Sequence, residues 1–195
     1  MKWLIAGLLL LSYLMPGQST LNGLGRLVIG QTTADALLRL GFRELDPPLV
    51  KGTIALPCSH LRIFQTDRFR YENHIVSDLT AILYDDRLFW ISCDLTDSLK
   101  TAFIGRHGPG RPAPQHRPIL CRGPEARPLT LSSVSWLYGE VQALAVTAEG
   151  TGADCRNLRA ARLNIVDRTL LAVTTECDLE GVDPLFETAR KVLPP

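Results

Sequence analysis

The sequence predicts an α+β fold in which hairpins of an antiparallel sheet are packed by short helices. Residues 79–95 contain two strand-like runs on either side of a short Asp-Asp-Arg turn, which is the pattern of a β-hairpin. Helical patterns lie on both sides of this hairpin, and they can cover one face of the sheet. In the second arm, side chains alternate between a strongly apolar face and a mixed face. The apolar face is expected to hold Phe89, Ile91, Cys93 and Leu95, and the mixed face Leu88, Trp90, Ser92 and Asp94.

Residues 1–19 have the layout of a secretory signal peptide. One positive charge at Lys2 precedes an apolar run over residues 3–15, and small residues then precede the expected cleavage site before Thr20. The run is shorter than the roughly 20 apolar residues that cross a bilayer, so a membrane anchor is the less favoured alternative. The expected product is residues 20–195, a single domain in the periplasm or outside the cell, with no membrane span after cleavage.

The balance of charge argues against a nucleic-acid-binding protein. The sequence has 21 Lys and Arg residues against 20 Asp and Glu residues, for a formal net charge of +1. Loss of Lys2 with the leader would bring this charge to zero, whereas general nucleic-acid binding depends on a basic surface.

Short-range patterns predict the elements of the first half. A helix is expected over residues 33–40, where either Thr32 or Thr33 can cap its first turn. A second helix is expected over residues 97–104, with its cap at Thr96. Residues 67–75 match no single pattern. Strands are expected at residues 50–56, 61–66, 76–84 and 88–95.

The second half repeats this order of elements. A terminal helix is expected from Asp183, because the proline that follows suits the first turn of a helix. The two halves, residues 20–104 and 129–195, are therefore interpreted as a tandem pseudo-repeat. Strands are expected at residues 131–138, 141–148, 162–166 and 169–175, the last two forming a hairpin.

Residues 105–128, here called the arginine loop, join the two halves. They contain six prolines and four glycines, and proline lacks the backbone donor that a regular element needs. They also contain five arginines against one acidic residue. Such a loop can meet anionic lipid headgroups, a cell-wall polymer or an acidic protein surface, and the alternative is a solvated connector. The candidate binding residues are Arg106, Arg111, Arg117, Arg122 and Arg127.

The five cysteines lack the C-x-x-C spacing of zinc ribbons and thioredoxins. In an exported protein they are expected to form disulfides. A hairpin between the last two predicted strands would place Cys177 close to Cys155, so the predicted bridge is Cys155–Cys177. Cys93 is left either as a buried free thiol or as a partner of Cys58 or Cys121.

Two segments resemble small exported α+β domains. The segment IGQTTADALLRLGF (29–42) is similar to the Gly-x-Thr, short helix, Leu-Gly opening of such domains, and LTAILYDDRLFWIS (79–92) to their hairpin with an Asp-rich turn. Examples are the outer-membrane lipoprotein of the β-barrel assembly machinery and β-lactamase inhibitor protein. The chain departs from these domains in its arginine loop, and from the lipoprotein in lacking an acylated cysteine. The resemblance implies a binding scaffold in the cell envelope and carries over no functional residue.

No catalytic motif is present, and neither a cofactor nor a metal site is predicted. Ser59 and His60, with Asp67 or Asp78 downstream, lack the G-x-S-x-G elbow of a hydrolase and are interpreted as surface polar residues. A metal site at His60, His74 and Asp78 is the less favoured alternative, because no two histidines have the spacing of a zinc motif.

Trp90 and Trp136 occupy equivalent hairpin arms. Pointing outward they would form a surface for a partner, and pointing inward they would fill the core. The sequence therefore leads to an exported, non-catalytic protein of the cell envelope that binds an envelope protein or an anionic envelope component. The alternative is a small periplasmic hydrolase whose site is assembled from dispersed residues.

Overall fold

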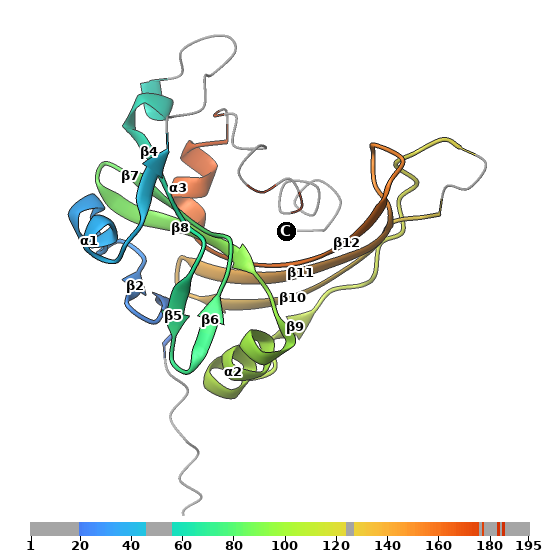
Figure 1. The fold of residues 1–195 in the computed structure, drawn as a ribbon, viewed down its shortest axis with the longest axis horizontal. Helices are drawn as coiled ribbons and strands as arrows, with labels where there is room; N and C mark the ends of the chain where they lie inside the picture. Colours follow the sequence, from blue (N-terminus) through green and yellow to red (C-terminus); the bar gives the residue numbers. More distant parts are fainter. Residues whose placement is uncertain are drawn as a thin grey trace, which may run out of the picture.

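The computed structural model describes residues 20–45, 56–123 and 127–175, together with Cys177, Asp183 and Leu185 (Figure 1). The predicted signal peptide, nearly all of the strand expected at residues 50–56 and most of the terminal helix lie outside the described residues. None of the helices in the described ranges has the length and apolar composition that a membrane span requires.

An eight-stranded antiparallel sheet dominates the fold, which confirms the predicted α+β class. The helices are short: α1 (Ala34–Arg39), α2 (Asp97–His107), α3 (Arg168–Val173) and the 3₁₀ helix η1 (Leu56–His60). Two small hairpins pack beside the sheet, β1 (Gly23–Leu24) with β2 (Leu27–Val28), and β5 (Phe69–Tyr71) with β6 (His74–Val76). In spatial order the strands of the large sheet are β3 (Arg43–Leu45), β4 (Leu61–Thr66), β7 (Leu79–Tyr84), β8 (Arg87–Asp94), β12 (Asn157–Asp167), β11 (Val141–Thr151), β10 (Thr130–Tyr138) and β9 (Arg111–Pro112).

The first predicted hairpin is strands β7 and β8, with a bulge that the alternating pattern did not anticipate. The register changes between Ile82 and Leu83, so β8 has one extra residue opposite β7. As a result Leu88 packs with Ile91 in the larger cluster, while Phe89 packs with Trp90 in the cluster on the other face. The predicted alternation holds from Trp90 onward, because a bulge reverses the faces only on one side of the extra residue.

Capping side chains define the starts of the two predicted helices. Thr33 accepts a hydrogen bond from the backbone N–H of Ala36 (3.4 Å), and Thr96 accepts one from Leu99 (3.2 Å). Asp86, in the turn of the hairpin, accepts a further bond from the backbone N–H of Ala34 at 3.0 Å. The acidic turn therefore has a structural role, since it satisfies an N–H at the start of α1.

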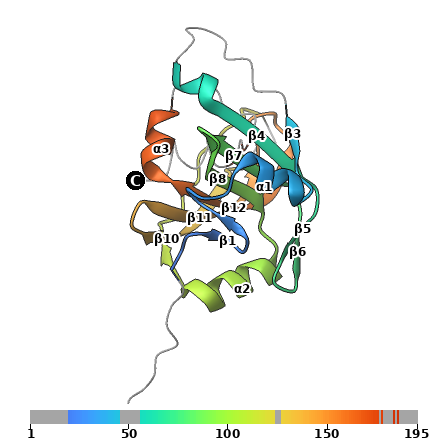
Figure 2. The ribbon, with the colours of Figure 1, turned by 90° about the vertical axis from the view of Figure 1, so that its left-hand side faces the viewer.

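Helices cover both faces of the sheet, so the expectation of helices on one face is wrong. In one cluster Cys93 and Leu163 of the sheet pack with α1 and with Phe103 of α2. In a second cluster Trp90 packs with Leu170 of α3. Figure 1 shows α2 on the convex side of the long strands and α3 on their concave side, and Figure 2 shows the same layers from the side. The mixed face of β8 is also buried and therefore also needs cover.

The strand expected at residues 169–175 is wrong, because the chain forms helix α3 there. The carboxylate of Asp167 accepts hydrogen bonds from the backbone N–H groups of Thr169 (2.9 Å) and Leu170 (3.1 Å). An aspartate at this position starts a helix as readily as it starts a turn. Residues 67–75, which matched no pattern, contribute the small hairpin β5–β6.

The predicted Cys155–Cys177 disulfide is also wrong, for the same reason. The two disulfides are Cys58–Cys177 and Cys121–Cys155, with Cα separations of 5.6 and 5.2 Å. Strand β12 has 11 residues and lies between Cys155 and Cys177. Because α3 replaces the strand that would have run back along β12, Cys177 stays near the α3 end of β12, where it bonds to Cys58, whereas Cys155 lies just before the other end of β12.

Cys93 is a buried free thiol, one of the two alternatives that the sequence left open. Burial raises its pKa from 9.0 to about 12, because a thiolate would lose its hydration inside the core. The contribution of this shift to stability is complete below about pH 9 and is lost as the pH rises toward 12.

We expect a thiol reagent to label no cysteine of the native chain at neutral pH and to label Cys93 after unfolding in urea. Labelling of Cys93 in the folded chain would contradict its burial.

Candidate functional site

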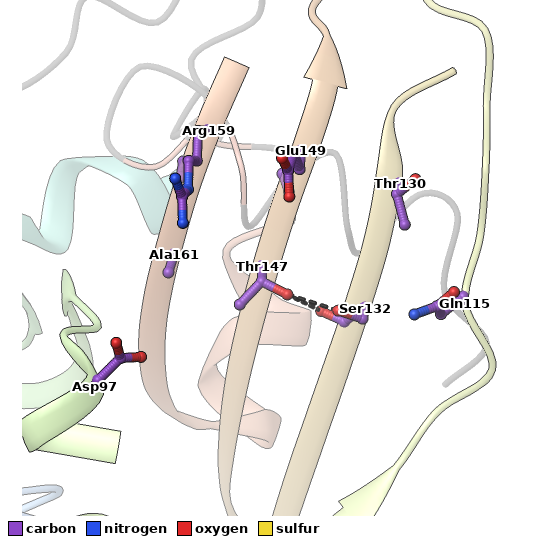
Figure 3. A pocket seen from close by; sticks show the side chains of 10 residues that line it. Asp97, Gln115, Thr130, Ser132, Thr147, Glu149, Arg159 and Ala161 are labelled. Atoms are coloured by element: carbon purple, nitrogen blue, oxygen red, sulfur yellow. Dashed lines mark hydrogen bonds between the residues drawn. The ribbon is translucent and has the colours of Figure 1, made fainter. Parts of the chain in front are cut away.

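A polar pocket of about 630 Å³ lies on the α2 side of the long strands, at the end where β10 begins (Figure 3). Its floor comes from three neighbouring strands and its sides from α2 and the arginine loop. Figure 3 shows the lining side chains Asp97, Gln115, Thr130, Ser132, Thr147, Glu149, Arg159 and Ala161.

The floor follows from the strand register. Ser132 pairs with Thr147, and Thr147 pairs with Ala161, so these three side chains share one face. The Ser132 and Thr147 hydroxyls form a hydrogen bond of 2.6 Å. Farther along β10 on the same face, Trp136 packs against Phe103 of α2. The change from large apolar to small polar side chains marks where the core ends and the pocket begins.

The rim of the pocket presents ionic and amide groups that are free to bind a ligand. Glu149 and Arg159 are cross-strand neighbours, Asp97 lies at the start of α2, and Gln115 approaches from the opposite side (Figure 3). Within the described ranges no hydrogen bond or ion pair engages the side chains of these four residues. The pocket therefore offers both hydrogen-bond donors and acceptors to a polar ligand.

The arginine loop is fixed to the edge of the sheet, and a short part of it is strand β9. Hydrogen bonds join Ala113 N–H to Ser133 O (3.0 Å), His116 N–H to Leu131 O (3.0 Å) and Leu131 N–H to His116 O (2.8 Å). The Cys121–Cys155 disulfide ties the loop to the turn between β11 and β12. The loop is therefore held in place beside the pocket, and Gln115 belongs to both.

All five candidate arginines are exposed. Arg106 pairs with Glu72 through Nη1 at 2.9 Å. The other four are Arg111, Arg117, Arg122 and Arg127. Among the described residues, no side chain pairs with their guanidinium groups. Binding of a partner through these arginines stays a prediction.

The two tryptophans do not form a surface for a partner. Trp90 is fully buried, and its Nε1 donates to Asn164 Oδ1 at 2.7 Å. Trp136 is almost fully buried, packs edge-on against Phe103 and donates to Gly108 O at 2.8 Å. A Cβ on Gly110 would lie 2.6 Å from the Trp136 ring, so this close packing requires glycine. Both tryptophan side chains therefore fill the core, which is one of the two alternatives that the sequence left open.

Sequence reasoning missed a buried charge cluster around Arg162, on the concave face of the sheet. Its Nε donates to Asp183 Oδ2 at 3.2 Å, and Nη1 donates to Asp94 (2.9 Å) and to Asp78. Burial alone would lower the pKa of Arg162, but the carboxylates, with Asp183 foremost, hold it above its ordinary value. The available signal was a pair of polar residues, Arg162 and Asn164, on one face of the strand expected at residues 162–166.

A single carboxylate oxygen organises this cluster. Asp183 Oδ2 also accepts hydrogen bonds from the Ser92 hydroxyl and from Asn164 Nδ2, the latter at 3.1 Å. The Asn164 carboxamide is oriented in turn by Trp90. These contacts attach Asp183 to the middle of the sheet, so the cluster has a structural role.

The histidines considered as hydrolase or metal residues lie apart. His60 pairs through Nδ1 with Asp85 at 2.5 Å, and not with Asp67 or Asp78. Both members of this pair are exposed, so the site lacks the water-excluded surroundings that favour catalysis. Within the described ranges no group of three potential metal ligands comes together.

Neither a family model, nor a curated protein, nor a solved structure matches this chain. The resemblance to small exported domains therefore stays a prediction, and so does the tandem pseudo-repeat.

Proposed function

We propose that this chain is an exported, non-catalytic protein of the bacterial cell envelope that binds an envelope component. Its binding surface is the described part of the arginine loop together with the polar pocket beside it. The two intramolecular disulfides favour an oxidising compartment and so support the location outside the cytoplasm.

The attachment of the arginine loop is the observation that carries this proposal. A connector between two halves needs neither a ladder of backbone hydrogen bonds to β10 nor a disulfide to a distant turn. Both restraints reduce the conformational freedom that the loop would lose on binding, which raises affinity without new contacts. Four guanidinium groups without side-chain partners in the described structure stand on this restrained backbone, so they are available to an anionic partner.

We expect a salt-sensitive association with one fraction of the native envelope. The exported chain, with both disulfides formed, is immobilised and incubated separately with membrane vesicles, cell-wall polymer and soluble envelope proteins. Replacing both Arg117 and Arg122 with glutamine should reduce binding by at least about tenfold, because each charge near an anionic surface is worth on the order of 1 kcal/mol. High salt should release the bound fraction, since it screens exposed charges.

The matched control replaces Arg68 and Arg70 with glutamine. Both are exposed, and the net charge changes by the same amount. This control should bind like the unmodified chain. If both double variants lost the same amount of binding, the loss would follow from net charge and not from the arginine loop. If the unmodified chain bound none of the envelope fractions, the proposal would be rejected.

A further inference from the structure

Residues 117–122 of the arginine loop, here called the apex, expose two large apolar side chains between two arginines. Ile119 is 69% exposed and Leu120 is 37% exposed. Arg117 and Arg122 lie on either side of this pair and are exposed as well. A singly exposed apolar side chain is common, but two adjacent ones rimmed by arginines form a candidate contact surface.

Restraints on both sides of the pair keep it at the surface. Before it, Pro118 O accepts a hydrogen bond of 2.9 Å from Leu129 N–H. After it, the Cys121 side chain points inward, is 5% exposed and forms the disulfide to Cys155. The apex therefore cannot turn over and bury Ile119 without breaking one of these restraints.

The combination of groups selects the kind of partner. A cell-wall polymer complements the arginines but has no apolar phase for Ile119 and Leu120. An acidic protein surface complements the charge, but its charged residues are depleted where apolar contacts concentrate. An anionic bilayer has both, with phosphates at the headgroup level and hydrocarbon directly below them.

We propose that the apex of the arginine loop docks on the surface of an anionic lipid bilayer. Ile119 and Leu120 enter the boundary between headgroups and acyl chains, while Arg117 and Arg122 bind lipid phosphates. Arginine suits this position because its guanidinium pairs with phosphate while its aliphatic stem lies along apolar surface. The proposal rests on the proposed function and names its partner.

Vesicle sedimentation tests the proposal. The exported chain is mixed with vesicles of phosphatidylcholine alone or with an equal share of phosphatidylglycerol. We expect binding to the anionic vesicles and at least about tenfold weaker binding to the neutral ones. The Ile119→Ser/Leu120→Ser variant should lose about tenfold or more of its binding to anionic vesicles, because two apolar side chains no longer leave water. The Arg117→Gln/Arg122→Gln variant should lose a similar factor.

Two control variants make the result specific to the apex. Leu137→Ser removes an apolar side chain that is 61% exposed on another part of the surface, at the far end of β10. Arg68→Gln/Arg70→Gln removes the same amount of charge at and just before strand β5. Both should bind vesicles like the unmodified chain, and urea midpoints should show that every variant folds.

The outcomes separate this proposal from the proposed function. Unchanged vesicle binding by the Ile119→Ser/Leu120→Ser variant, or a larger loss in Leu137→Ser, would overturn docking by the apex. Retention of a wall polymer or an acidic protein that depends on Arg117 and Arg122, without vesicle binding, would overturn the lipid partner and leave the proposed function standing. Absence of binding to every fraction and to vesicles would reject both.

Discussion

Replacing Arg162 with methionine is expected to destabilise the fold by about 3–5 kcal/mol. The Arg162 side chain is 10% exposed and that of Asp183 is 2% exposed. Methionine would remove the guanidinium that pairs with the buried Asp183 carboxylate, and removing one partner of a buried ion pair is strongly destabilising. Asp78 and Asp94 are about half exposed, so water can solvate them and their share of the loss is small.

Urea unfolding of three variants tests this expectation. The double variant Arg162→Met/Asp183→Asn removes both charges, so we expect it to recover part of the stability that Arg162→Met loses. Arg70→Met, at an exposed position on β5, should change the free energy of unfolding by less than about 0.5 kcal/mol. A loss below about 1 kcal/mol in Arg162→Met would show that the buried pair contributes little.

Removing the Cys58–Cys177 disulfide is expected to cost more stability than removing Cys121–Cys155. The first bridge joins residues 119 positions apart and the second joins residues 34 positions apart. A cross-link restricts the unfolded chain more when it closes a longer loop, which gives upper values of about 5 and about 4 kcal/mol for the two bridges. The first bridge also holds Cys177 against the cluster that contains Trp90.

Paired serine variants measure the difference directly. The free energy of unfolding of Cys58→Ser/Cys177→Ser is compared with that of Cys121→Ser/Cys155→Ser. The reverse order of stability would show that folded-state contacts outweigh the entropy of loop closure. A non-reducing digest provides an independent check, since a peptide linking Cys155 to Cys177 would contradict both bridges.

Local patterns sufficed for the elements whose signals lie within a few residues. The hairpin β7–β8, the helices α1 and α2 and the long pair β10–β11 were all predicted close to their observed bounds. Their caps and turns are made largely by neighbours in sequence, such as Thr33 for α1 and Thr96 for α2. The strand prediction at residues 169–175 was wrong because a short apolar segment suits a strand or a helix equally well.

The candidate site was only partly visible in the sequence. The arginine loop stood out through its composition, but its attachment to β10 depends on pairing between residues far apart in the chain. The polar pocket needs residues from α2, from the arginine loop and from three strands, so no single stretch of sequence displays it. The Arg162 cluster likewise joins residues from β8, from β12 and from the chain beyond α3.

The sequence by itself determined the α+β class, the main hairpins, two capped helices and a basic proline-rich segment, because these depend on periodicity and capping over short distances. Only the tertiary structure decided the disulfide partners, the burial of both tryptophans, the cover on the second face and the exposure of Ile119 and Leu120. Each of these depends on which distant segments come together when the sheet buries both of its faces, and short-range spacing carries no information about that.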